Sequence, residues 1–194
     1  MVFENPIFNS VFLLFSYALL GGGVKYIDQA HDASVYSKRV ALILAVLCGT
    51  LMSLLIATDS YSAILLIAIV FGVVFTKKVD NYSFLIGTII VMLFPFVYWI
   101  NAGFPIIDVS ALVFLSITGI IDELGNDAYD RKKMRGWLGK FFAYRCMMKV
   151  GALLLFAVSR LPLVYFFAFV CFDIGYTLVD IHANNREKAA KLHA

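Results

Sequence analysis

Long apolar runs alternate with short polar segments along the whole chain. The runs lack the strict polar and apolar alternation of membrane β-strands, and a helix in lipid satisfies its own backbone hydrogen bonds. The pattern therefore predicts an all-α polytopic membrane protein, built as a bundle of about seven transmembrane helices. We expect the spans at residues 6–20, 40–58, 61–75, 82–100, 105–121, 137–159 and 161–180.

Composition supports this interpretation. Of the 194 residues, 62% are hydrophobic and 15% are charged, whereas soluble domains have about 45–50% and about 25%. Seven spans of about 20 residues leave only short loops, so we expect one membrane domain over residues 1–183 and a polar cytoplasmic tail over residues 184–194. The net charge of +3 is too small to indicate nucleic-acid binding.

The distribution of basic residues predicts the orientation. Most of the Lys and Arg residues follow the first, third, fifth and seventh predicted spans. Because basic residues concentrate in cytoplasmic loops, we expect the N-terminus outside and the C-terminus in the cytoplasm. We expect the membrane to be a prokaryotic plasma membrane.

Two acidic clusters fall on the same predicted side of the membrane. Asp28 and Asp32 stand four residues apart after the first span, and a second cluster at residues 122–130 follows the fifth. Carboxylates with this spacing lie one turn apart on a helix, and oxygen ligands without thiolates favour Mg²⁺. The candidate metal ligands are Asp28, Asp32, Asp122, Asn126, Asp127 and Asp130. Each cluster alone also fits a solvated loop whose charges are balanced by nearby bases.

Ionisable residues also lie within the predicted sixth and seventh spans, where such residues are by default functional candidates. Arg145 and Lys149 are i, i+4, and Asp173 and Asp180 are i, i+7, so each pair shares one helix face. Two interpretations stay open: the pairs neutralise each other, or the cations face the acidic clusters. Bases that trail the acids suit phosphate oxygens.

The two acidic clusters resemble the motifs of the UbiA superfamily of intramembrane prenyltransferases. Residues 28–32 are similar to part of its first motif, NDxxDxxxD, and residues 122–130 are similar to its second, DxxxDxxxD. Four helix traverses separate the two in both cases. This chain has Val24 where the first motif begins with Asn, and seven spans where the family commonly has nine, which leaves open whether a homo-oligomer completes the bundle.

The resemblance implies a Mg²⁺-dependent transferase of lipid biosynthesis. The acids would hold an isoprenyl diphosphate through Mg²⁺, the diphosphate would leave, and a lipid-like or aromatic acceptor, or the prenyl chain itself, would capture the carbocation. The implied catalytic residues are Asp28, Asp32, Asp122, Asp127 and Lys149. The implied substrate-binding residues are Lys38, Arg39, Asn126, Asp130, Arg131, Arg145, Asp173 and Tyr144.

Two other functions and a purely structural role compete with this one. A small transporter or channel would also place acids at helix ends and charges within spans, but an ion path needs polar residues at both faces. A phosphotransferase acting on CDP-linked lipids also uses Mg²⁺ and aspartates, yet residues 122–125 do not supply its DGxxAR signature. The one-sided distribution of polar residues therefore argues against a conduction path, and the missing signature argues against the phosphotransferase.

Overall fold

The computed structural model describes residues 6–131, 133, 134 and 136–192, excluding the side chains of residues 6, 130 and 190–192. Within this part of the chain all regular structure is helical, so the all-α prediction is confirmed. The helices are α1 (Pro6–His31), α2 (Lys38–Thr58), α3 (Ser60–Phe75), α4 (Tyr82–Ala102), α5 (Val109–Asp130), α6 (Gly136–Ala143), α7 (Cys146–Ala157) and α8 (Leu163–Leu192).

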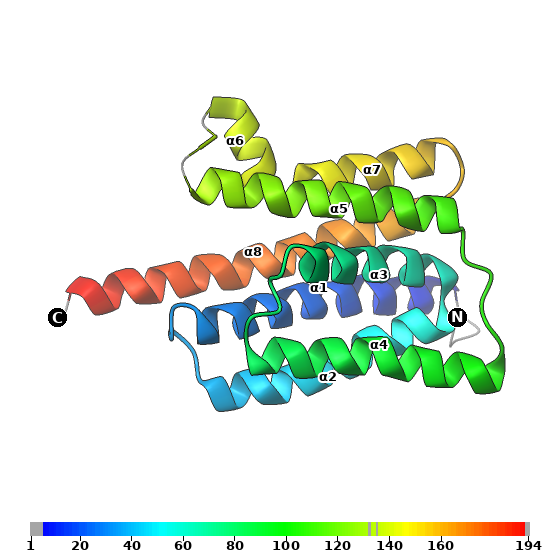
Figure 1. The fold of residues 1–194 in the computed structure, drawn as a ribbon, viewed down its shortest axis with the longest axis horizontal. Coiled ribbons are helices and arrows are strands. Elements are labelled where there is room, and N and C mark those ends of the chain that lie inside the picture. The colour runs from blue at the N-terminus through cyan, green and yellow to red at the C-terminus, as the bar shows by residue number, and fades with distance from the viewer. Residues whose placement is uncertain (1–5, 132, 135, 193–194) are drawn as a thin grey trace.

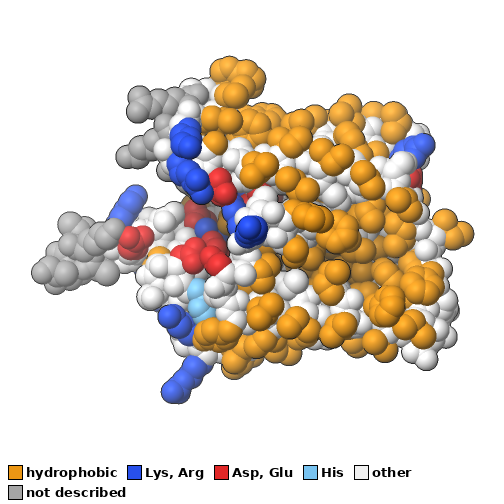
Figure 2. Space-filling model, viewed as in Figure 1, with side chains coloured by type: hydrophobic (Ala, Val, Ile, Leu, Met, Phe, Trp, Pro, Cys, Tyr) orange, Lys and Arg blue, Asp and Glu red, His pale blue; other side chains and the backbone are white. Residues whose placement is uncertain are grey.

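Five of these helices are long and apolar enough to cross a membrane, namely α1, α2, α4, α5 and α8. The apolar helices α3 and α7 are shorter. Apolar side chains cover much of the side of the bundle (Figure 2), as expected of a surface that contacts lipid. The chain is therefore an integral membrane protein, and the number of seven spans and the orientation stay predictions.

The main helix pairs of the bundle are parallel, because the two helices of each pair run in the same direction. Helix α1 lies along α8, α2 along α4, and α3 along α5 (Figure 1). Two glycines allow the closest of these contacts: a Cβ atom at Gly21 would collide with the carbonyl of Phe172, and one at Gly175 with the carbonyl of Ala18. Small residues let membrane helices approach closely. This contact brings the last turns of α1 beside the middle of α8.

Three helices continue beyond their predicted ends. Helix α1 runs through the glycines at 21–23, although glycine is a poor helix former, because its packing against α8 overrides that local preference. Helix α5 continues to Asp130, so the second acidic motif is helical, and α8 continues to Leu192 through most of the expected tail.

The predicted sixth span over residues 137–159 is wrong, because the chain breaks there into α6 and α7. Arg145 stands between them in the left-handed region, with φ 48° and ψ 51°. The first N–H groups of α7 have no partner within that helix, and a carboxylate from α5 accepts two of them. An apolar run does not reveal a break whose hydrogen bonds are satisfied by a distant residue.

Candidate functional site

Charged side chains gather at one end of the bundle (Figure 2). Helices α1, α3 and α5 end there and α2, α4 and α7 begin there (Figure 1). At the opposite end, Arg160 pairs with Asp108 at 2.8 Å from Nη1 to Oδ2. The two acidic motifs therefore share one end, as the sequence predicts.

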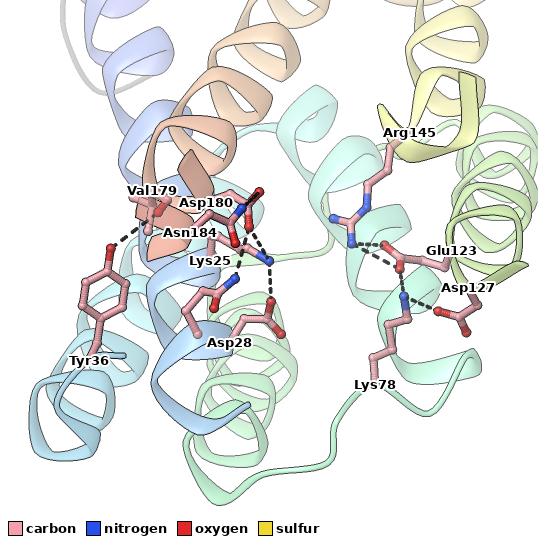
Figure 3. Close-up of polar contacts among 11 residues, drawn as sticks. Lys25, Asp28, Tyr36, Lys78, Glu123, Asp127, Arg145, Val179, Asp180 and Asn184 are labelled. Carbon is pink, nitrogen blue, oxygen red and sulfur yellow. Dashed lines mark hydrogen bonds and ion pairs between the residues drawn. The ribbon is translucent and has the colours of Figure 1, made fainter. Parts of the chain in front are cut away.

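The first acidic motif meets α8 through a lysine of α1. Lys25 Nζ lies 2.8 Å from Asp28 Oδ2 and 3.1 Å from Asp180 Oδ1 (Figure 3). Asp32 follows the end of α1, where partial desolvation and the charges of Asp28 and Asp80 raise its pKa. Asp28 and Asp32 thus form a pair of neighbouring carboxylates that repel each other.

The second motif is bridged by a lysine from the loop between α3 and α4. Lys78 Nζ lies 2.6 Å from Glu123 Oε2 and 2.9 Å from Asp127 Oδ1 (Figure 3). Arg145 Nη2 lies 3.2 Å from the other Glu123 oxygen. Burial lowers the pKa of Lys78, but the charge and hydrogen bonds of Glu123 and Asp127 raise it overall, so the ammonium stays charged.

Asp122 has a different role in this structure from its neighbours. Its two carboxylate oxygens accept the N–H groups of Met147 at 2.9 Å and Met148 at 2.6 Å, at the start of α7. The Asp122 side chain is buried. Because Arg145 precedes α7 without a side-chain capping bond, the carboxylate from α5 supplies the cap and fixes the position of the break.

Replacing Asp122 with alanine is expected to lower the free energy of unfolding by about 1–3 kcal/mol, because two buried N–H groups lose a charged acceptor. Asp122→Asn keeps one acceptor oxygen and should lose less. Unfolding of the purified protein in detergent, followed by circular dichroism, measures both. An alanine variant that unfolds like the wild type would show that the carboxylate is not a structural cap.

A cavity of about 310 Å³ lies at the charged end. Its lining consists of Lys25, Asn126, Tyr129, Ala143, Tyr144, Arg145, Asp173, Tyr176, Thr177 and Asp180. Two cationic side chains lie over the ring of Tyr176: Lys25 Nζ is 5.0 Å and Arg145 Cζ is 4.8 Å from the ring centroid. Both contacts are within the range of cation–π attraction. The cavity thus combines cations, carboxylates and aromatic faces.

The charged residues of the predicted sixth and seventh spans separate into two roles. Asp173 and Asp180 both line the cavity, as their spacing predicts. Lys149 Nζ lies 2.6 Å from Asp173 Oδ2 and 2.6 Å from the carbonyl of Tyr144. Lys149 therefore holds the wall of the cavity in place, whereas Arg145, which precedes α7, is part of the lining.

Other predicted residues lie farther out. Lys38 and Arg39 are exposed in the first turn of α2, and Arg131 is exposed at the end of α5. The side chain of Asp130 lies outside the described residues. Sequence analysis did not select Lys25 or Lys78 as site residues. The i, i+3 spacing of Lys25 and Asp28 was a usable signal, but the contact of Lys78 depends on tertiary packing.

Two smaller hollows lie next to the polar cavity, on the side of the apolar interior. Arg145 and Asp173 also line a hollow of about 40 Å³ with Phe169 and Phe172. Ile69 lines that hollow and a further one of about 70 Å³ between α1, α2, α3 and α4, whose lining is almost entirely apolar. The polar cavity and the neighbouring apolar hollow together suit a ligand that has a charged head and an apolar tail.

The two acidic motifs differ in how well they fit Mg²⁺. Asp28 and Asp32 offer neighbouring carboxylates, which is suitable chemistry for a hard cation. In the second motif the acids already bind Lys78, Arg145 and backbone N–H groups. Across the described residues, no group of three or more His, Cys, Asp or Glu side chains is close enough to hold a metal ion.

Known proteins do not decide between these interpretations. The resemblance to the UbiA superfamily rests on the spacing of the two acidic motifs, and the structure places both motifs at one end of the bundle. Comparison of the chain with protein-family models, with curated proteins and with solved structures found no match.

Proposed function

We propose that the protein is a Mg²⁺-dependent intramembrane prenyltransferase that transfers an isoprenyl group from its diphosphate to a lipid-like or aromatic acceptor. The observation that carries the proposal is the cavity at the charged end, which combines two cations and three tyrosines and shares Arg145 and Asp173 with a smaller hollow lined partly by Phe169 and Phe172. The proposal includes seven spans and a cavity that faces the cytoplasm of a prokaryotic cell.

Each part of the cavity has a role in this reaction. Lys25 and Arg145 would bind phosphate oxygens, for which a guanidinium offers paired donors. The allylic C–O bond breaks, its electron pair leaves with the diphosphate, and the acceptor forms a bond to the same carbon and loses a proton. The ring faces of Tyr129, Tyr144 and Tyr176 would attract the developing positive charge.

The proposal assigns Mg²⁺ to the pair Asp28 and Asp32. A bound Mg²⁺ would neutralise charge on the diphosphate and make it a better leaving group. The pair lies in the same network as the cavity, because Asp28 binds Lys25, which lines it. The prenyl chain would extend past Phe169 and Phe172 into the apolar hollow between α1, α2, α3 and α4.

Thermal unfolding in detergent tests the proposal directly. Mg²⁺ together with farnesyl or geranylgeranyl diphosphate is expected to stabilise the protein by about 2.7 kcal/mol at a hundredfold excess over Kd. Mg²⁺ alone should stabilise the protein less, because the diphosphate adds oxygen ligands to the cation, and the diphosphate alone should not stabilise it, because the diphosphate binds through Mg²⁺.

The control is a set of charge-neutralising variants. Asp28→Asn/Asp32→Asn should lose the stabilisation, whereas Asp80→Asn, which removes a nearby exposed carboxylate outside the pair, should keep it. Stabilisation that needs no Mg²⁺, or that survives in the Asp28→Asn/Asp32→Asn variant, would contradict the metal assignment. No stabilisation in a protein that unfolds cooperatively would contradict the prenyltransferase.

A further inference from the structure

The ammonium of Lys78 occupies the position between the acids of the second motif. Glu123 and Asp127 stand one turn apart on α5, and Lys78 reaches both from the loop between α3 and α4 (Figure 3). The two short contacts, 2.6 and 2.9 Å, are those of charge-assisted hydrogen bonds. A cation supplied by the chain is already bound where the motif would bind a metal.

Cations of the chain already occupy the carboxylate oxygens of this group. Lys78 binds Glu123 and Asp127, and Arg145 binds the other oxygen of Glu123. Side-chain exposure is only 8% for Glu123, so a divalent cation would have to displace the ammonium from a mostly buried carboxylate. Breaking a buried ion pair by removing one partner is costly.

The first motif has fewer cations for its acids. Asp28 shares Lys25 with Asp180, and Asp32 lies beside two other carboxylates. Here the local charge is negative, and a divalent cation would relieve the repulsion between Asp28 and Asp32. The second motif therefore suits the ammonium that it already binds, whereas the first motif suits a divalent cation.

We infer that Lys78 takes the place of a metal ion at the second acidic motif, so that the protein binds a single divalent cation, at Asp28 and Asp32. The inference deepens the proposed function and rests on it for the role of that cation. Lys78 is a positioning residue, because it does not line the cavity itself but binds one oxygen of Glu123. Arg145 binds the other oxygen of Glu123 and also lines the cavity, where its guanidinium can bind a charged ligand.

Counting the Mn²⁺ ions bound by the whole 194-residue chain tests this inference. Electron paramagnetic resonance of Mn²⁺ alone, titrated into the protein in detergent, reports free and bound ion without any diphosphate. We expect one bound Mn²⁺ on the wild type and two on Lys78→Ala. Lys78→Arg, which keeps a cation, and Lys77→Ala, which alters an exposed neighbour, should each bind one.

A second variant covers the case in which Lys78→Ala does not fold. Asp127→Asn should bind Mn²⁺ within about twofold of the wild-type affinity, whereas Asp28→Asn should lose at least tenfold. Zero or two ions on the wild type, one ion on folded Lys78→Ala, or a tenfold loss in Asp127→Asn would overturn the inference. Stabilisation by Mg²⁺ and farnesyl diphosphate is measured separately, so a failure of the proposed function is distinguishable.

Discussion

Glu123→Ala is expected to destabilise the protein by about 3 kcal/mol. Glu123 is buried, and it binds Lys78 from the loop before α4 and Arg145 from the start of α7. Breaking a buried ion pair by removing one partner typically costs about 3–5 kcal/mol. Both cations here are partly exposed, which places the effect at the lower end. The midpoint of denaturant-induced unfolding in detergent, followed by helical circular dichroism, measures the loss.

Matched variants separate charge from packing. Glu123→Gln keeps the shape and one acceptor oxygen, so its loss should be smaller than that of alanine. In Glu123→Gln/Lys78→Met, the loss should be less than the sum of the two single losses, because neither charge is left without its partner. Strict additivity would show that Lys78 and Glu123 do not interact in the folded protein.

Much of the fold follows from hydrophobic pattern alone. The apolar runs predict the positions of α2, α3 and α4 closely, because apolar length and polar turns bound each of them. Helix ends that lie beyond the apolar runs cannot be predicted in this way, because they depend on tertiary contacts. Continuation of α1 through its glycines depends on the contact with α8, and the break before α7 depends on Asp122, which is distant in sequence.

The site was predictable to a similar extent. Helix count and spacing place both acidic motifs at one end, and Arg145, Asp173, Asn126 and Tyr144 do line a common cavity. The sequence does not predict which charged side chains form ion pairs, because no local pattern indicates that Lys78 contacts Glu123. The same limit applies to Asp122, because a carboxylate in a motif has identical local sequence whether it binds a metal or caps a helix.

The left-handed backbone of Arg145 connects the fold to the proposed chemistry. A non-glycine residue in this region costs about 1–2 kcal/mol, and Arg145 adopts it where α6 gives way to α7. The guanidinium is thereby held against Glu123 and over the ring of Tyr176. Strain of this kind persists where neighbouring contacts impose it, and it clusters at functional sites.

Arg145→Gly is therefore expected to separate stability from activity. Glycine adopts the left-handed region without strain, which offsets part of the lost pairing with Glu123, and Lys78 still neutralises that carboxylate. The free energy of unfolding should change by less than about 1 kcal/mol, given the size of the strain that is relieved. Prenyl transfer should fall about 10²–10³-fold, the usual effect of losing one group that stabilises charge in the transition state.

Arg145→Lys provides the matched control, because it keeps the charge but loses the paired donors of the guanidinium. Its kcat for prenyl transfer should lie between those of the wild type and Arg145→Gly. The measurement is kcat and KM with farnesyl diphosphate, taken with the unfolding midpoint of each variant. Full activity in Arg145→Gly would remove the guanidinium from the reaction, and a large loss of stability would show that its contacts in the fold outweigh the strain of its backbone.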